Sequence, residues 1–522
     1  MEFISKIKDK EFLIHIQCLF LALAVVASPI YSLPKSFQFG GIGGKLSCYF
    51  IILGLLFCMA EFFIYRFKIP KPVLRFLGIL LLWNIFTEFV GLITYPYYSM
   101  INPAGSEKLS ALIQFLDAHH FDVISNVVIE AVWIGARAFK NTFIDFLYTF
   151  VVSAWVIHLF YENFNEGFNK IRKYILILAV ALGVYAIPEI LLFKFHMKIG
   201  LDILSITNPF LYDVGQYLDW YPPLIWSNEQ LRSYSTEPSI FGFLAASIIP
   251  ISWSYFKNKI RWEYCSFYSY FIMLVFMTKS RTANAIVLYN GITLILLFFI
   301  SKTKKIILLL FALSCVGFGA NIALNYVPDF QISKQPEQST QVEKTENISG
   351  YYNDNMKTIL EKDARSNGSR LINIKSHLNV VMEHPLLGVG RNLKEFYVKE
   401  RLTPDAMDNE EIRSITKILN EKGPLGPASY GNVNQYVFVL ANTGMIGLFI
   451  YLLPVMYMSY EFIKKHLWYD DKTLILYIAL VGNLLAQMAG EGTILLYIIG
   501  GLLYVGIVNY DENQHNKSGE AK

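Results

Sequence analysis

The stretch SYSTEPSIFGFLAASIIPISWSY, residues 233–255, contains the pattern that decides the fold. After Pro238 it is almost entirely apolar, and about 20 such residues are enough to cross a bilayer as a helix. A carboxylate, Glu237, stands at the start of the run, five positions after Arg232. Because a charge is costly to remove from water, this placement of Glu237 needs a structural or a functional explanation.

The same apolar character extends over the whole chain of 522 residues. Hydrophobic residues make up 54% and charged residues 16%, with a mean hydropathy of +0.39, which excludes an ordinary soluble domain. A formal net charge of +4 is too small for this length to indicate a nucleic-acid partner. The five cysteines lie in apolar segments without metal-ligand spacing. We therefore expect no disulfide framework, no metal and no cofactor.

The apolar runs predict an all-α, polytopic membrane protein with about twelve transmembrane helices. The predicted spans lie near residues 12–32, 46–65, 76–96, 142–161, 174–194, 236–256, 262–278, 282–301, 305–323, 434–459, 473–489 and 492–509. The even-numbered connections between them are short and basic, as is typical of the cytoplasmic side. Their basic residues are Arg66, Lys68, Lys71, Arg75, Lys170, Arg172, Lys173, Lys257, Lys259, Arg261, Lys302, Lys304, Lys305, Lys464, Lys465 and Lys472. Both termini are therefore expected in the cytoplasm.

Three longer connections, near residues 97–141, 195–235 and 324–433, are predicted on the outer side. In the first, residues 123–138 are apolar but contain Asn126, Glu130 and Arg137, so we expect an interfacial helix there rather than a span. If this segment did span, the alternation of charge after it would invert.

The last outer connection begins with a stretch too polar to form a core. Residues 354–402 then show helical spacing of apolar positions, at Leu371, Ile374, Leu378, Val381 and Met382. We expect three parts: a bundle of spans 1–9 (1–323), a large outer loop with a helical cap (324–433), and spans 10–12 with a cytoplasmic tail (434–522).

Cations gather at the predicted outer ends of the spans, where positive charge is usually scarce. Lys279, Ser280 and Arg281 separate two long apolar runs, and Arg370 and Arg391 lie in the large outer loop. One interpretation is that these cations snorkel to the headgroups or form ordinary surface charge. The other adds Arg232 and makes the set a diphosphate site, because guanidinium groups bind phosphate oxygens bidentately and stay charged.

Two interpretations of Glu237 remain open. In the first, Glu237 belongs to the start of a helix, where Ser235 or Thr236 can cap and Pro238 fits the first turn. A negative charge at that end also complements the helix dipole. In the second, Glu237 holds or orients one of the arginines of a phosphate site.

Four segments resemble the O-antigen polymerase and O-antigen ligase superfamily of bacterial membrane glycosyltransferases. They are EPSIFG at 237–242, TKSRTA at 278–283, SRLINIKSHLNVVMEHPLLGVGRN at 369–392 and NVNQYVFVLANTGMIG at 432–447. The resemblance implies that a glycan passes from undecaprenyl diphosphate to an acceptor hydroxyl, at the outer face of the cytoplasmic membrane, without a metal or nucleotide sugar. The implied partners are the lipid-linked oligosaccharide and membrane lipids, with a flippase and a chain-length regulator as further candidates.

The motifs assign roles by resemblance. Arg281 and Arg370 are the expected diphosphate contacts and stabilise the leaving charge. Further substrate contacts are expected at Arg391, Lys279, Ser280 and Arg232.

The sequence departs from the ligase pattern at one position. Ligases carry a His two residues before an Asn, Ser or Gln that precedes Gly-x-x-Gly. Asn434, Gly444 and Gly447 fit that spacing, but Asn432 stands where the His would be. An amide cannot accept the proton, so a base would come from elsewhere, and Asn432 and Asn434 are kept as substrate contacts. The candidate bases are Glu237, His384 or an acid of the cap such as Glu410 or Glu411.

The missing His favours a polymerase, which joins lipid-linked repeat units into a capsule, exopolysaccharide or O-antigen. A ligase-like transferase is the alternative within the family. A transporter or flippase of lipid-linked sugars is the alternative from another class, although transporters tend to show internal repeats and charges near the bilayer midplane. A non-catalytic scaffold would leave the arginines unexplained.

Overall fold

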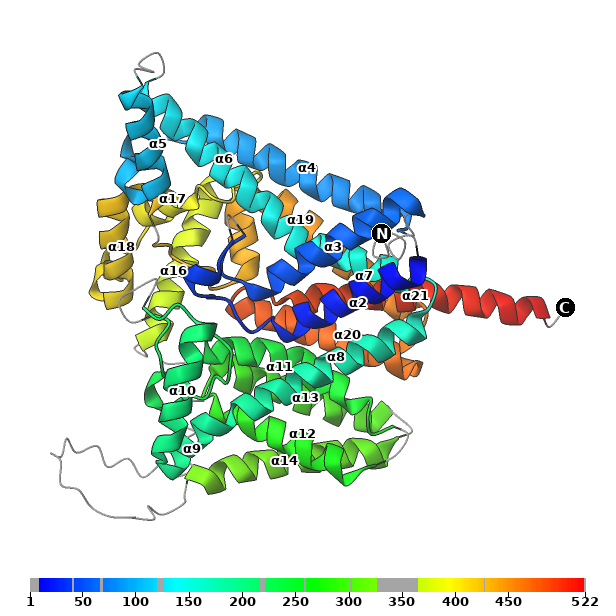
Figure 1. The fold of residues 1–522 in the computed structure, drawn as a ribbon. Coiled ribbons are helices and arrows are strands. Elements are labelled where there is room, and N and C mark those ends of the chain that lie inside the picture. Colours follow the sequence, from blue (N-terminus) through cyan, green and yellow to red (C-terminus); the bar gives the residue numbers. More distant parts are fainter. Residues whose placement is uncertain are drawn as a thin grey trace, which may run out of the picture.

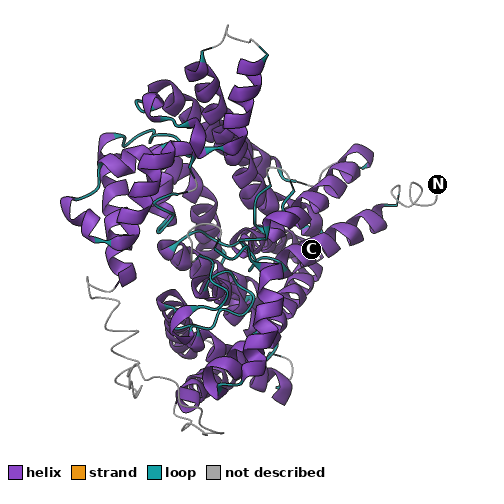
Figure 2. Ribbon diagram, turned by 60° about the vertical axis from the view of Figure 1, so that its left-hand side comes forward, coloured by secondary structure: helices purple, strands orange, loops and turns teal. Residues whose placement is uncertain are grey.

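The computed structural model describes residues 9–39, 42–65, 69–119, 125–215, 221–257, 260–300, 303–325, 365–426 and 428–520. In these ranges the chain forms helices joined by loops and no β-strand, as the turned view also shows (Figure 2). Long helices run side by side, and α5, α16, α17 and α18 gather at one end (Figure 1). This arrangement confirms the predicted all-α, polytopic membrane protein, and the helices gathered at this end are called the cap below.

Within the described ranges, eight helical segments are long and apolar enough to cross a bilayer. They are α3 (Leu46–Ile64), α4 (Lys71–Thr94), α6 to α7 (Asn126–Phe160), α8 to α9 (Phe164–Phe195), α13 (Arg281–Ile300), α14 (Lys304–Asn325), α19 (Gln435–Lys464) and α20 with one further turn (Asp471–Ala489). The other predicted spans coincide with α2 (Lys10–Val26), α11 (Pro238–Trp253), α12 (Trp262–Met277) and α21 (Ile494–Glu520). Since α2, α11 and α12 have only 17, 16 and 16 residues, the count of twelve stays a prediction.

The first outer connection does not hold a separate interfacial helix. Instead, α6 (Asn126–Phe146) continues through a π-helical turn into α7 (Val152–Phe160) as one helix of 35 residues. Such a helix is about 52 Å long at 1.5 Å per residue, much longer than the hydrocarbon core. Its polar positions do not mark a break, because the start of the helix packs under the cap: Arg137 Nη1 donates to Leu425 O at 2.9 Å.

The short helix α11 forms the centre of the bundle. Nearly all of its side chains are buried, and it packs against α8 (Phe164–Tyr185), α13 and α20. The contact with α13 is close because both helices carry small residues there: a Cβ at Gly242 would lie 2.8 Å from the backbone nitrogen of Ala283. The N-terminal parts of α11, which follows Glu237, and of α13, which begins at Arg281, therefore lie side by side.

A second hydrophobic cluster holds the outer cap together. It joins residues of the first outer connection to residues of the large loop, among them Tyr95, Tyr97, Leu109, Phe396 and Tyr430. The cap helices are α5 (Glu107–Ala118), α16 (Arg365–Glu383), α17 (Lys394–Glu400) and α18 (Glu410–Lys422). On the same end of the molecule, α9 (Ile187–Phe195) leads into α10 (Lys198–Leu211) (Figure 1). The cap is thus built from two outer connections rather than one.

Helix α16 was predicted correctly, but its buried face was not. Leu371, Leu378 and Met382 are 43%, 40% and 81% exposed. The buried positions are instead largely polar, namely Ser369, Asn373, Ser376 and His377, together with Val380 and Val381. The helix turns this face toward α19 and α17, so its apolar spacing marked the outer face and not the packed one.

Candidate functional site

Several predicted residues meet at residues 489–491, which join α20 to α21 and are called the 489–491 junction below. Arg370 Nη1 lies 3.5 Å from Ala489 O. The backbone oxygen of Asn432 lies 3.6 Å from the position that a Cβ would take at Gly490. Lys45 Nζ forms an ion pair with Glu491 at 2.7 Å. Four segments far apart in the sequence therefore converge at this junction.

Arg281 and Arg370 lie near one another. Arg281 begins α13 after a tight turn in which Lys279 has a φ of +50° and Ser280 O accepts a hydrogen bond from Asn284 N at 3.0 Å. The guanidinium of Arg370, on α16, acts electrostatically on that of Arg281. Two like charges at close range repel each other, and an anion between them removes that repulsion. This pair therefore has the character of an anion-binding site.

Glu237 occupies the N-cap position of α11, but its side chain makes no cap hydrogen bond. Its carboxylate accepts hydrogen bonds from the hydroxyls of Tyr221 and Ser239, the second at 2.8 Å. It also acts electrostatically on the hydroxyl of Tyr31, whose ring lies 5.0 Å from Lys45 Nζ. The carboxylate is thus held by the hydroxyl of Tyr221 and by a hydroxyl of the first turn of α11.

Arg391 follows a turn that fits into a break in α19. The turn is anchored by Val389 N, which donates to Ala441 O, and by Gly390 N, which donates to Asn442 O, both at 3.0 Å. Gly388 has a φ of +67°, and a Cβ there would lie 2.4 Å from the carbonyl carbon of Asn442. Only glycine fits such a position.

The break in α19 is itself at a glycine. Gly444 has a φ of +68°, and a Cβ there would lie 2.0 Å from Leu386 O. The turn therefore packs into the break in α19, and this contact fixes the backbone position of Arg391. Its backbone nitrogen donates to Glu88 at 2.8 Å, and its guanidinium pairs with Asp145 at 2.7 Å.

The two ion pairs near the junction remain accessible. The side chains of Lys45 and Glu491 are 42% and 50% exposed, and those of Arg391 and Asp145 are 28% and 39% exposed. Lys45 holds the pKa of Glu491 below its usual range. These charges can therefore exchange partners with an incoming polar ligand.

Four residues of this region were missed by sequence reasoning: Lys45, Glu88, Asp145 and Glu491. Each is a charge inside or at the end of an apolar run, which is a signal of function in a membrane protein. Their convergence could not be foreseen, because they belong to four separate segments.

Arg232 is placed away from these charges. Its side chain is 0% exposed, and its guanidinium donates to Thr236 O, Pro223 O and Leu224 O at 3.2, 2.8 and 2.8 Å. It also stacks on the Tyr212 ring at 4.4 Å. Because these contacts occupy Arg232 within the fold, we leave it out of the site proposed below.

Two further candidates have structural roles. Asn434 caps α19, since its Oδ1 accepts hydrogen bonds from Tyr436 N at 3.0 Å and Val437 N at 3.2 Å. Asn432 donates its amide to Gln435 Oε1 at 2.5 Å. Asn434 therefore serves the fold, while Asn432 lies at the junction.

The remaining candidate bases lie in the cap. The His384 ring meets the edge of Tyr397 at 5.4 Å, and burial lowers its pKa. Glu410 and Glu411 begin α18 after the cap residue Asn409. No contact described for these three residues links them to the 489–491 junction.

One known family matches the part of the chain that holds most of these residues. Residues 266–452 match the model of the family described as O-antigen ligase, a segment that includes Arg281, Arg370, Arg391 and Asn432. Members of this family are membrane glycosyltransferase-like enzymes that act on lipid-linked oligosaccharides. No curated protein matches the chain. The match, which runs from within α12 to within α19 of an all-α polytopic fold, supports a relation to the O-antigen ligase and polymerase superfamily.

Proposed function

We propose that the chain is a polymerase that joins undecaprenyl-diphosphate-linked oligosaccharide units at the outer face of the cytoplasmic membrane. The observation that carries this proposal is the electrostatic interaction of Arg281 with Arg370, which itself lies beside the 489–491 junction. A diphosphate bound there relieves their repulsion. The stabilisation grows as the leaving diphosphate gains charge, and preorganised cations of this kind are often the main source of catalysis.

The transfer step needs an acceptor for one proton. An acceptor hydroxyl attacks the anomeric carbon, the bond from that carbon to the diphosphate breaks, and the hydroxyl proton passes to a base. We assign this role to Glu237, because Tyr221 and Ser239 orient its carboxylate and its helix start adjoins that of Arg281. His384 is a weaker candidate because it packs against Tyr397 in the cap.

A polymerase fits better than a ligase because of Asn432 and the second group of cations. The amide of Asn432 cannot act as a base, whereas a polymerase must accommodate two lipid diphosphates. Lys45 and Arg391 are a second group of cations, each paired with an accessible carboxylate. A second diphosphate would compete there with Glu491 and Asp145.

The flippase alternative has one observation in its favour. Glu61 and His158 form a buried pair at 3.2 Å between α3 and α7, and intramembrane ionisable groups often line transport paths. However, Gln17 donates to Glu61 at 2.8 Å and Trp155 donates to Gln17 at 3.0 Å. This closed network has the features of a helix-packing device, so we rank transport second.

Deletion of the gene in its host tests the proposal. Loss of long glycan chains on a gel, with single repeat units still attached to the final acceptor, supports a polymerase. Full-length chains that accumulate on undecaprenyl diphosphate would show a ligase instead. The proposed orientation is checked by a reporter active only outside the cytoplasm, which should work when fused near residue 350 and fail near residue 467.

Glu237→Gln tests the base. General-base catalysis contributes roughly 10²–10⁴ in rate, so the purified variant should lose that factor in polymerisation of a lipid-linked unit and still bind the donor. Glu410→Gln, in the cap, is the matched control and should keep full activity. Equal rates for both variants would remove Glu237 from the mechanism.

A further inference from the structure

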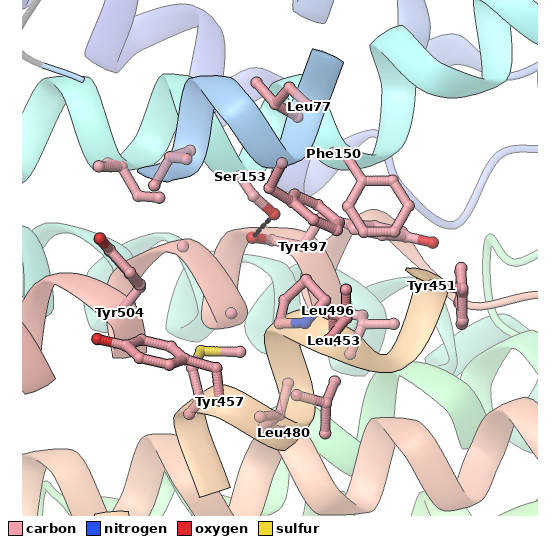
Figure 3. A pocket seen from close by; sticks show the side chains of 18 of the residues that line it. Leu77, Phe150, Ser153, Tyr451, Leu453, Tyr457, Leu480, Leu496, Tyr497 and Tyr504 are labelled. Atoms are coloured by element: carbon pink, nitrogen blue, oxygen red, sulfur yellow. Dashed lines mark hydrogen bonds between the residues drawn. The ribbon is translucent and has the colours of Figure 1, made fainter. Parts of the chain in front are cut away.

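An apolar groove of about 410 Å³ lies between α4, α7, α19, α20 and α21. Figure 3 shows its walls: Leu77 comes from α4, Leu453 and Tyr457 from α19, Leu480 from α20 and Tyr504 from α21. The volume is in the range of about 300–1,000 Å³ that is typical of ligand sites. Tyr457, at one edge of the groove, is 46% exposed, so the groove is open on this side.

The groove adjoins a smaller pocket whose lining is more polar than its own. Phe150, Tyr451 and Tyr497 line both spaces, and the smaller pocket also contains Arg391 and Asn442. The guanidinium of Arg391 acts electrostatically on the hydroxyls of Tyr451 and Tyr497. An apolar channel thus ends near a cation, an arrangement that suits a lipid with an anionic headgroup.

The wall of the groove is fixed on α21 and leaves space for a guest. Gly501 packs against α7, where a Cβ would lie 2.6 Å from Ser153 O, and Ser153 Oγ donates to Tyr497 O at 2.7 Å. At Gly500, in contrast, a Cβ would meet no atom nearer than 3.9 Å. The packing that holds α21 in place therefore does not fill the groove at Gly500.

We propose that this groove holds the polyprenyl chain of a lipid diphosphate whose headgroup reaches Arg391, an inference that rests on the proposed function. Surrounding lipid is as apolar as the groove, so the groove gains little from the hydrophobic effect. It supplies van der Waals packing and a fixed path for the chain. Arg391 favours a lipid with an anionic headgroup over a neutral one, and among anionic lipids the proposed function favours the polyprenyl diphosphate.

Photo-crosslinking of the full chain tests this inference. A photoreactive phenylalanine analogue replaces Val455, in the groove wall, or, as control, Leu288, which is 56% exposed on α13. The protein is placed in vesicles of phosphatidylethanolamine and phosphatidylglycerol with radiolabelled undecaprenyl diphosphate. We expect labelling from position 455 well above that from 288, and competition by unlabelled undecaprenyl diphosphate. Equal labelling at both positions, or crosslinks from 455 to phospholipid alone, would overturn the inference.

Filling the groove sharpens the test. Gly500→Leu should abolish labelling from position 455. Gly319→Leu is the matched control, because a Cβ at Gly319, on α14, likewise meets no close neighbour, with nothing within 4 Å, and it should leave labelling unchanged. If Gly500→Leu does not fold, Leu77→Trp fills the groove from α4 instead and should also abolish labelling from position 455. Labelling that survives in the filled grooves would refute the proposed site.

A short-chain probe separates this inference from the proposed function. Farnesyl diphosphate carries the headgroup but too short a tail to depend on the groove. In one outcome, farnesyl diphosphate binds and its binding needs Arg281 and Arg370, but undecaprenyl diphosphate does not label position 455. This outcome would refute the groove and leave the proposed function standing. If neither diphosphate binds, the proposed function itself fails.

Discussion

Arg232 and Arg370 lie in two regions that use the same side chain in opposite ways. In the segment before α11, the Arg232 guanidinium is fully buried, donates to three backbone carbonyls and stacks on Tyr212. At the 489–491 junction, the half-buried Arg370 makes one long contact of 3.5 Å and lies near a second arginine. The Arg232 guanidinium binds the backbone of a loop and so stabilises the fold. The Arg370 guanidinium lies near a like charge, and such a contact does not stabilise a fold.

The first and largest expected effect is on stability. Arg232→Ala leaves three carbonyls without their donor, and removal of one partner from a buried charged network costs ~3–5 kcal/mol. We expect little folded protein in the membrane and a lower melting temperature in detergent. Arg413→Ala, on an exposed face of α18, is the control. Normal accumulation of the Arg232 variant would erase the contrast between the two regions.

The second expected effect is on rate rather than on folding. Arg281→Ala or Arg370→Ala should insert normally and lose on the order of a hundredfold in activity, about 3 kcal/mol of barrier. Substitution by Lys should rescue only partly, because it keeps the charge but loses the bidentate geometry. Polymer synthesis and melting temperature are measured on the same preparations. Normal polymer from both alanine variants would show that these arginines are ordinary surface cations.

A smaller effect is expected at the ion pair of Lys45 and Glu491. The pair is accessible, so a double-mutant cycle with Lys45→Met and Glu491→Gln should give a stability coupling of only ~0.2–1 kcal/mol. Loss of Lys45 should also raise the pKa of Glu491, because that lysine is what lowers it. Melting temperatures of the four proteins at neutral pH measure the coupling. A coupling of several kcal/mol would mean that the junction is as structural as the Arg232 region.

The smallest effect is a pH dependence in the cap. Hydrogen bonding from Arg401 lowers the pKa of Glu383 below its ordinary value of 4.5. The pair therefore stabilises the fold fully above that pH, and its contribution is lost as the pH falls through the lowered pKa. Glu383→Gln should lower the melting temperature slightly at pH 7, with the difference from wild type shrinking in acid. A difference that grows in acid would contradict the sign.

The sequence predicted the fold class because bilayer-length apolar runs depend only on composition. It also singled out Arg281 and Glu237, because each is a charge beside such a run, and Arg370, because its motif resembles that of a known family. It failed for the face of α16, since a helix at the surface of a membrane protein can expose Leu371 and bury Ser376. The continuity of α6 and α7 was missed because polar residues that face a cap look the same in sequence as polar residues that end a span.

The separate uses of Arg232 and Arg370 were beyond sequence reasoning as well. Both are arginines next to serine near apolar segments. What distinguishes them is the carbonyl groups of residues 223 and 224, which fold back on Arg232 alone. Such contacts depend on the loop path, which no local pattern encodes.

The interlock of the 388–390 turn with the break in α19 limits how chains of this kind can be recombined. A Cβ at Gly91, on α4, would also lie 2.5 Å from Val389 O, so the turn packs closely against two membrane helices, α4 and α19. An outer loop grafted from a relative would bring a different turn, which would not fit the break in α19 of this chain. Chimeras that exchange the loop alone should therefore misfold, whereas those that exchange loop and α19 as one cassette should assemble. The cap and the membrane helix beneath it would then be inherited as a single unit.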